Sequence, residues 1–205
     1  MPRFSKAQRE RIRTVLLDRA AQFFAERSYA AVTLEDVTAA AGIAKGTFYS
    51  FFEGKEDLFS QVCEREHTRF HKHVEGLFAG VDVCRREQVR DALHAVVRDL
   101  AANPLLRRVL DERDTPVWLE VRDAPAGRLG QERASTELMA GLIEAGQRAG
   151  VMREGDPEEL AAVCGQLTAG FLVSSSAAGA ETLRRLETAL DLVVDGLYTV
   201  GRSER

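Results

Sequence analysis

The sequence predicts an all-α protein, built as a three-helix head that is continuous with a larger helical body. Apolar residues recur at helical spacing through nearly the whole chain, and no stretch keeps the alternation of apolar and polar residues typical of a strand. A helix-turn-helix pattern lies near the N-terminus, over about residues 33–52. We therefore expect about nine helices, with the head in residues 1–54 and the body in residues 55–205.

Composition and charge suit a soluble protein with a nucleic-acid partner at one end. The 205 residues are 45 % hydrophobic and 29 % charged, as in ordinary globular proteins. No apolar run reaches the roughly 18 residues that span a bilayer, and the N-terminus has no apolar signal-peptide core, so we expect a cytoplasmic protein with no membrane partner. Residues 1–55 hold nine Lys or Arg and six Asp or Glu, whereas the remaining residues hold 19 and 26. A basic head on an acidic body favours a small nucleic-acid-binding module.

The first two helices of the head have clear limits in the sequence. The first should run from Lys6 to Glu26. Its apolar face consists of Ile12, Val15, Leu16, Ala20, Phe23 and Phe24. The second should open at Thr33, whose hydroxyl is placed to form a capping box with Asp36. Gly42 then permits the turn that follows.

The third helix is short and leads into a long fourth helix. It should run from Lys45 to about Phe52, and it is too short to be stable alone. Phe48 and Phe52 should therefore anchor its apolar side in the head. A fourth helix should continue from Lys55 towards Val81. No Gly/Pro/Ser-rich linker separates head from body, so we expect the two to be mechanically connected.

The rest of the body should also be helical. The expected helices cover residues 85–102, 104–113, 126–149, 157–177 and 180–200. Apolar residues of the last two repeat at the spacing of a helix-bundle seam, namely Leu160, Val163, Leu167 and Phe171, then Leu183, Leu186, Leu190, Val193 and Leu197. Two interpretations remain open. Both helices pack in their own core, or they supply half of an intermolecular four-helix bundle and make the protein a homodimer.

The polar residues of the third helix point to DNA. Major-groove recognition needs a short, rigid helix with small or polar side chains near its N-terminus. The third helix supplies a cation, a residue without a side chain for close approach, and hydroxyl groups, while the neighbouring helix N-termini attract phosphate. The candidate DNA contacts are Lys45, Thr47 and Ser50 for bases, Thr33, Tyr49 and Lys55 for phosphates, and Gly46 for close approach. The alternative is a helical hairpin whose Lys/Thr face is merely solvated.

The full string AAAGIAKGTFYSFFEGKEDLF closely resembles the signature of the TetR family of transcriptional repressors, and the resemblance covers about residues 10–70. It implies an all-helical homodimer that binds a double-stranded operator through a three-helix head. It also implies a body pocket whose small-molecule ligand releases the operator. By position, it implies the same seven DNA contacts. Ala44 stands where members often have Ser, and Phe51 where they often have His, so two phosphate-bonding side chains are replaced.

The effector pocket is less defined by the sequence than the DNA contacts. Large side chains on the body helices are candidates for its lining, namely Phe78, His94, Trp118, Met139 and Phe171. Each of them is equally compatible with the body core. No group of polar residues identifies a ligand class, and we expect no cofactor.

Cys63, His67 and His71 recur along one side of the fourth helix, which raises the question of a metal sensor. Their angular drift away from the apolar face predicts that Cys63 is buried, that His67 lies at the border and that His71 is exposed. A third ligand would have to come from elsewhere. We therefore expect no metal site. Cys84, beside two arginines, is the only candidate for redox sensing.

Two other functions compete with regulation. A helical enzyme could use the body pocket, but the sequence shows no nucleophile–base pair, phosphate loop or acid pair. An interaction protein could dimerise through its last helices and use the head for protein contact. Only a DNA-binding protein should lose affinity steeply with salt.

Overall fold

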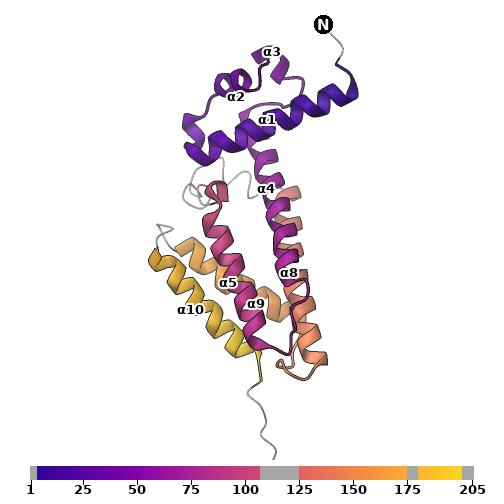
Figure 1. Cartoon of the computed structure of the whole chain (residues 1–205), viewed down its shortest axis with the longest axis vertical. Helices are drawn as coiled ribbons and strands as arrows, with labels where there is room; N and C mark the ends of the chain where they lie inside the picture. The colour runs from indigo at the N-terminus through magenta and orange to yellow at the C-terminus, as the bar shows by residue number, and fades with distance from the viewer. Residues whose placement is uncertain (1–3, 107–124, 175–179, 200–205) are drawn as a thin grey trace, which may run out of the picture. The chain divides into compact units, whose positions relative to one another are not determined.

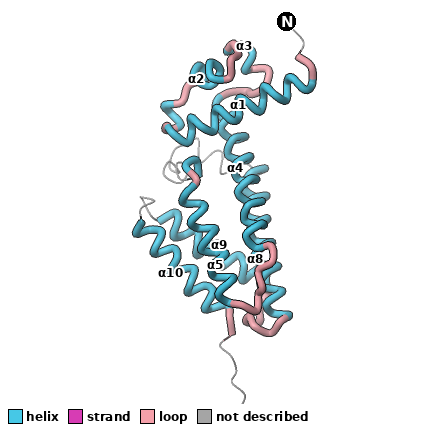
Figure 2. Tube along the Cα trace, in the orientation of Figure 1, coloured by secondary structure: helices cyan, strands magenta, loops and turns pink. Residues whose placement is uncertain are grey.

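The structure is a computed structural model that describes residues 4–106, 125–174 and 180–199, and its described elements are helices (Figures 1 and 2). The all-α prediction is confirmed. Within these ranges no helix combines the length and apolarity needed to cross a bilayer. The described residues divide into two compact units, the first with residues 4–68 and 104–106, the second with residues 69–103, 125–174 and 180–199. The first turns of the fourth helix therefore pack with the head, and the functional division at residue 54 stays a prediction.

The head begins with α1 (Lys6–Glu26), as predicted. Ser5 sets its start, because the Ser5 side chain accepts a hydrogen bond from the Gln8 N–H, one of the donors that a helix N-terminus leaves unsatisfied. The buried residues of α1 are Leu16, Leu17, Ala20 and Phe24. Leu17 belongs to the head core although the predicted face did not include it. Each such large side chain contributes about 1.5–3 kcal/mol when buried.

A short 3-10 helix, η1 (Tyr29–Ala31), joins α1 to α2 (Leu34–Ala40). The predicted capping box is confirmed, with Thr33 and Asp36 each bonding the other's backbone N–H. Gly42 has a φ of 66°, a conformation that costs glycine little and other residues more. The Ile43 N–H then donates to the Thr38 carbonyl at 3.0 Å, which closes the turn of the helix-turn-helix.

The third helix is shorter than predicted. α3 covers Lys45–Phe48 and then passes into a turn. Within that turn the N–H groups of Ser50 and Phe51 donate three residues back, at 3.1 and 2.8 Å, which tightens the backbone relative to an α-helix. Phe48 and Phe52 are both buried in the head core, as predicted, although the helix does not continue to Phe52.

The body consists of the end of α4 (Lys55–Phe78) together with α5 (Arg86–Ala102), α8 (Pro125–Arg148), α9 (Pro157–Ser174) and α10 (Ala180–Leu197). α9 packs against α8 and α10, and α10 packs against α5 (Figure 1). α4 and α10 end a few residues earlier than predicted, and α9 is helical up to Ser174, the last residue described before residue 180. The predicted helix over residues 104–113 lies mostly outside the described residues.

A second hydrophobic core holds the body helices together. It joins Val89, Leu93 and Val97 of α5 to Ile143 of α8, Ala161 and Cys164 of α9, and Leu186, Leu190, Val194 and Leu197 of α10. After α10 the chain pairs with the segment that follows α8, where the Arg153 N–H donates to the Leu197 carbonyl and the Thr199 N–H donates to the Val151 carbonyl. These bonds satisfy a carbonyl that the end of α10 would otherwise leave open.

Ion pairs add a polar connection between α5 and α10. Arg90 contacts Asp191 and Asp195, each at 3.0 Å, and His94 Nε2 lies 3.1 Å from Asp191 Oδ1. Arg86 also contacts Asp195. All of these groups are partly solvated, so each pair contributes little to stability by itself. Their shared effect is to fix the register of α10 on α5.

Candidate nucleic-acid interface

α3 is held by its aromatic side and leaves its polar side open. Phe48 and Phe52 are buried in the head core and stack on each other with ring centroids 5.5 Å apart. Tyr49, next in the chain, is 55 % exposed. A four-residue helix has little stability of its own, so these buried rings are what present Tyr49 and its polar neighbours to the surroundings.

All seven predicted DNA contacts lie on the head and reach its surface. Thr47 and Lys55 are half-buried, and the other predicted contacts, Thr33, Lys45, Gly46, Tyr49 and Ser50, are exposed. A Cβ built on Gly46 would meet nothing within 4 Å in the head. The space above Gly46 is therefore open, as the predicted role in close approach requires.

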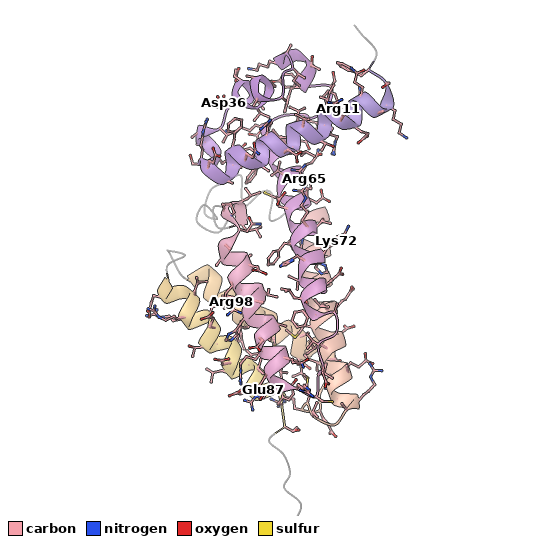
Figure 3. All side chains as sticks on the ribbon, viewed as in Figure 1. Arg11, Asp36, Arg65, Lys72, Glu87 and Arg98 are labelled. Atoms are coloured by element: carbon pink, nitrogen blue, oxygen red, sulfur yellow. The ribbon has the colours of Figure 1, made fainter. Side chains whose placement is uncertain are left out.

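Thr33 has a structural task that leaves one donor free. Its hydroxyl oxygen accepts from the Asp36 N–H at 3.1 Å, and its own N–H donates to Asp36 Oδ2 at 3.3 Å. Asp36, labelled in Figure 3, is also paired with Arg27 at 3.3 Å. A threonine hydroxyl both accepts and donates, so its O–H remains able to bond a phosphate oxygen while the cap stays intact.

Lys45 is paired with an acidic neighbour before any DNA is present. Its ammonium donates to Glu35 Oε1 of α2. That hydrogen bond lowers the pKa of the Glu35 carboxyl and raises the pKa of the Lys45 ammonium. Both side chains are more than half exposed, so the pair is weak and Lys45 is able to exchange it for a base or a phosphate.

Lys55 rests on an aromatic ring at the start of α4. Its Nζ lies 4.2 Å from the centre of the Tyr29 ring, a cation–π arrangement. The Tyr29 hydroxyl donates to Glu56 Oε1 at 2.9 Å. Burial lowers the pKa of Lys55, against a smaller opposing effect of Glu56. Tyr29 was not among the predicted site residues, because nothing in the sequence links it to a lysine so far along the chain.

Two arginines of α1 were also missed. Arg9 and Arg13 lie over the rings of Phe51 and Phe52, with the guanidinium carbons 5.1 and 5.5 Å from the ring centroids. The sequence shows only a basic start to α1. Which arginine faces the segment after α3 depends on how the two elements pack.

The structure describes the side chains of three of the five candidates for an effector pocket. His94 is paired with Asp191, while Phe78 and Met139 pack on the body core. Trp118 and the side chain of Phe171 lie outside what the structure describes. One groove formed by described residues lies between α9 and α10, and none of Phe78, His94 and Met139 lines it. The assignment of these five residues to a ligand stays a prediction.

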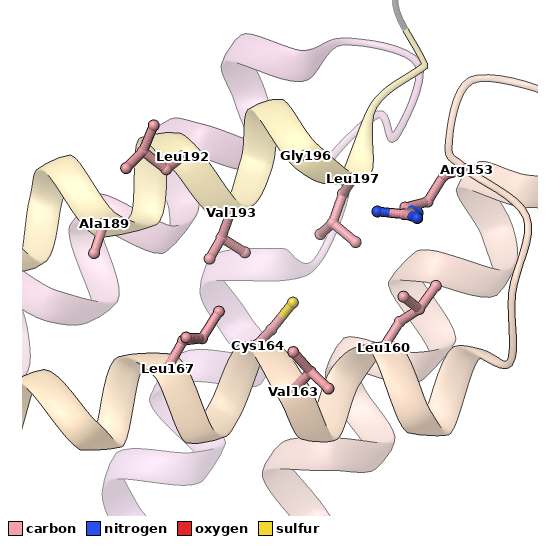
Figure 4. Close-up of a pocket in the computed structure, with 10 residues that line it drawn as sticks. All are labelled: Arg153, Leu160, Val163, Cys164, Leu167, Ala189, Leu192, Val193, Gly196 and Leu197. Carbon is pink, nitrogen blue, oxygen red and sulfur yellow. The ribbon is translucent and has the colours of Figure 1, made fainter.

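The groove between α9 and α10 has a volume of about 310 Å³ (Figure 4). It is lined by Arg153, Leu160, Val163, Cys164, Leu167, Ala189, Leu192, Val193, Gly196 and Leu197. Exposed fractions of 47 % for Val163, 50 % for Leu167 and 69 % for Leu192 are high for aliphatic side chains. This part of the chain therefore presents apolar surface rather than covering it.

The predicted dimer residues do not all lie on one surface. Leu160, Val163, Leu167, Val193 and Leu197 line the groove, whereas Leu183 packs on the body core and Phe171 is outside the described side chains. Leu186 and Leu190 are only 1 % and 3 % exposed within a single chain. They therefore have little surface left to bury against a partner, and their place in the interface stays a prediction. The same spacing serves α5 on the inner side of α10, and Leu192 is the exposed residue that the pattern missed.

Cys63, His67 and His71 of α4 differ in burial and do not form a metal-binding cluster among the described residues. Cys63 is buried as predicted, and burial raises its thiol pKa to about 12. His67 is half-buried, again as predicted. His71 is not exposed as expected: its side chain is 17 % exposed and pairs with Glu75 at 3.4 Å. A helical wheel predicts burial from the apolar face alone, so it does not predict contacts that polar residues of the same helix make with other side chains. Among the described residues no three His, Cys, Asp or Glu could hold a metal ion.

Known proteins resemble the chain in both sequence and fold. Residues 16–62 match the family of bacterial regulatory proteins called tetR. The HTH-type transcriptional repressor KstR2 of Rhodococcus jostii is 32 % identical over 158 residues, which cover 73 % of this chain and 72 % of the repressor. A TetR-family transcriptional regulator from Pectobacterium atrosepticum is 26 % identical, with a TM-score of 0.76 over 97 % of this chain and 100 % of its own.

A further solved structure shares the fold. SmeT, the repressor of the Stenotrophomonas maltophilia multidrug efflux pump SmeDEF, has a TM-score of 0.68 and 23 % identity over 92 % of this chain and 91 % of its own. The family match spans the helix-turn-helix and its aromatic base, and the KstR2 match extends over most of both proteins. The chain therefore belongs to the TetR family of bacterial transcriptional regulators.

Proposed function

We propose that this regulator is a repressor that binds a pseudo-palindromic operator as a homodimer and is released by a small molecule bound in its helical body. Its relatives are transcriptional regulators, and it is a DNA-binding regulator rather than an enzyme. The observation that carries the proposal is the geometry of α3. Buried Phe48 and Phe52 hold a short helix whose polar side lies at the surface of the head. A role on the chromosome places the protein in the cytoplasm.

The proposed reading surface has two kinds of contact. Lys45, Thr47 and Ser50 reach base edges, and the open space at Gly46 lets the DNA come close. Thr33, Tyr49 and Lys55 bind phosphates and hold the head in register. The Thr33 O–H and the Lys55 ammonium lie at or beside the N-termini of α2 and α4, where the helix dipoles also attract phosphate.

The second half of the proposal is the dimer. A pseudo-palindromic operator needs two heads at a fixed distance, because each head reads one half-site. The face of α9 and α10 that carries Val163, Leu167 and Leu192 supplies the apolar surface for a second copy. Large exposed apolar patches on soluble proteins mark interaction sites. Packing this groove against the same groove of a partner would form a four-helix bundle.

The third part is the effector. SmeT, which shares this fold, is known in complex with triclosan, and the body helices of the present chain carry the candidates Phe78, His94, Trp118, Met139 and Phe171. Ligand binding among body helices would favour a state in which α4 moves and the spacing of the two heads changes. α4 is one helix from Lys55 to Phe78, so a shift of its C-terminal end would be carried along it towards the head.

Selection from a pool of random duplexes tests the proposed function. The full-length protein should enrich a sequence with two inverted half-sites, and competition should show binding at least about 1,000-fold tighter than to a scrambled duplex. The affinity should fall steeply with salt. A protein that only makes protein contacts through its head would enrich no sequence and show no salt dependence, and this result would overturn the proposal.

A further inference from the structure

One arginine of α1 contacts the backbone at the end of the reading segment. Arg9 Nη2 donates to the Ser50 carbonyl at 2.8 Å. The guanidinium carbon of Arg9 also lies 5.1 Å from the centroid of the Phe51 ring. The Phe51 ring has Phe4 as a further neighbour, with centroids 6.4 Å apart. Arg9 is therefore fixed by a hydrogen bond and by an aromatic face, directly beside predicted DNA contacts.

A second arginine on the same side of α1 has a different environment. Arg13 lies over Phe52 and donates to the Gln61 side chain. It is half-buried, whereas Arg9 is exposed. Arg13 therefore connects α1 to α4 inside the head. Arg9, four residues earlier on the same side of α1, lies at the surface.

Arg9 keeps most of its donors for another partner. A guanidinium has five N–H donors in a planar fork, and the bond to Ser50 uses one of its terminal nitrogens. Among the described residues no carboxylate pairs with Arg9, in contrast to Lys45 with Glu35 and Arg65 with Asp18. Its charge is therefore not neutralised by an acidic side chain of the described head.

Three features of Arg9 suit it to bind an anion. The guanidinium is positioned, it is exposed, and it retains several donors. A planar fork matches the geometry of a phosphate group, and it loses less freedom on binding when it is already held. Phe51 has no hydrogen-bonding atom of its own on the side chain, so its contribution to DNA binding would pass through Arg9.

We propose that Arg9 is a phosphate-binding residue of the DNA interface, positioned by the Phe51 ring and the Ser50 carbonyl. The inference rests on the proposed function, because it needs DNA to lie along α3. It extends the interface from the helix-turn-helix to α1. Beside the segment that follows α3, the phosphate would then be bound by a residue that lies more than 40 positions earlier in the chain.

Arg11 offers a matched control on the same helix. It is exposed and carries the same charge (Figure 3 labels it on α1). Residues two apart on an α-helix point about 200° away from each other, so Arg11 cannot share the position of Arg9 over Phe51. Arg9→Ala and Arg11→Ala change the net charge equally and differ in the contact that they remove.

The experiment measures the affinity of full-length protein for the duplex enriched by the wild type, over a series of salt concentrations. Arg9→Ala should weaken binding by about tenfold or more per head. It should also reduce the slope of log affinity against log salt by about 0.9 for each head that engages the DNA. Arg11→Ala should change both much less. A purely structural role for Arg9 would lower the melting temperature of the head but leave the slope unchanged.

Two further variants separate position from charge. Arg9→Lys keeps the charge without the planar fork, and Phe51→Leu keeps an apolar side chain without the aromatic face. Both should lose part of the affinity, and Phe51→Leu should have little effect in an Arg9→Ala background. If Arg9→Ala and Arg11→Ala changed the DNA affinity and its salt dependence equally while the wild type still bound, the role of Arg9 would be overturned but the proposed function would not. A wild type that enriches no sequence would instead overturn the proposed function.

Discussion

The reading side of the head and the α9–α10 face of the body are both exposed, but their chemistry is opposite. The head presents Lys45, Tyr49 and Arg9 on a buried aromatic base. The body presents Val163, Leu167 and Leu192 beside a shallow apolar groove. A charged surface gains its affinity from phosphates and loses it with salt, while an apolar surface gains from the area that it buries and is little affected by salt. The two surfaces therefore suit different partners and respond to different changes.

The largest expected effect comes from placing charge on the apolar face. Val163→Asp together with Leu167→Asp should weaken the dimer by about 100-fold or more, because each carboxylate would have to be desolvated in the interface. DNA binding should weaken as well, since a monomer engages one half-site. Sedimentation velocity over a concentration series measures the first effect. Gln166→Asp, on an exposed residue of α9 that does not line the groove, is the control, and a double variant that stays dimeric alongside it would contradict the proposed interface.

Changes on the reading side should leave the dimer intact and affect only DNA. Lys45→Ala should cost about 1–3 kcal/mol of binding free energy and relax the preference for one base pair. Tyr49→Phe should weaken binding more evenly over all sequences, because it removes a phosphate contact. Competition against a panel of single-base-pair variants of the enriched duplex distinguishes the two. If Tyr49→Phe altered base preference and Lys45→Ala did not, their assigned roles would be reversed.

A smaller effect should come from the acidic partner of Lys45. Glu35→Gln releases Lys45 from its ion pair and removes a negative charge near the phosphates. Because exposed ion pairs are worth about 0–1 kcal/mol, the affinity for DNA should rise by a few-fold and the salt dependence should become steeper. Glu64→Gln makes the same change of charge on an exposed residue of α4 and serves as the control. Weaker binding by Glu35→Gln would mean that Glu35 orients Lys45 rather than competing for it.

The smallest effect is a pH dependence at Lys55. Burial lowers the pKa of Lys55 below its usual value, so the folded head releases this proton at a lower pH than the unfolded chain does. Between the lowered pKa and the usual value of about 10.4, the free energy of unfolding should therefore rise with pH. DNA affinity should fall over the same range, because the neutral amine no longer attracts phosphate. Lys55→Arg, whose charge persists, should flatten both trends in binding and unfolding titrations; unchanged trends would contradict the role of Lys55.

Local signals in the sequence predicted the framework of the head well. The capping box of Thr33 and Asp36 and the turn at Gly42 depend on neighbours within a few residues, and both are confirmed. The end of α3 was misplaced because Phe52 enters the core through a tight turn rather than a helix. That choice depends on the packing of the whole head, which no local pattern contains.

The rest of the candidate site depends on contacts between distant segments. The spacing of Leu186 and Leu190 is the same for a seam inside the chain and a seam between chains, so only the structure separates them from exposed Leu192. The placement of Arg9 beside Ser50 and of Lys55 on Tyr29 likewise requires the folded head. The sequence could identify which residues had the right chemistry, but not which of them share a surface.

Hydroxyl-radical footprinting of the full-length protein on its enriched duplex tests the central claim most directly. Two heads on a dimer should protect two inverted half-sites, with centres separated by about one helical turn, 34–36 Å, or a multiple of it. The Val163→Asp and Leu167→Asp variant should lose the paired protection at concentrations where the wild type keeps it. A single protected half-site for the wild type, or no protection at all, would contradict a dimer that reads DNA through α3.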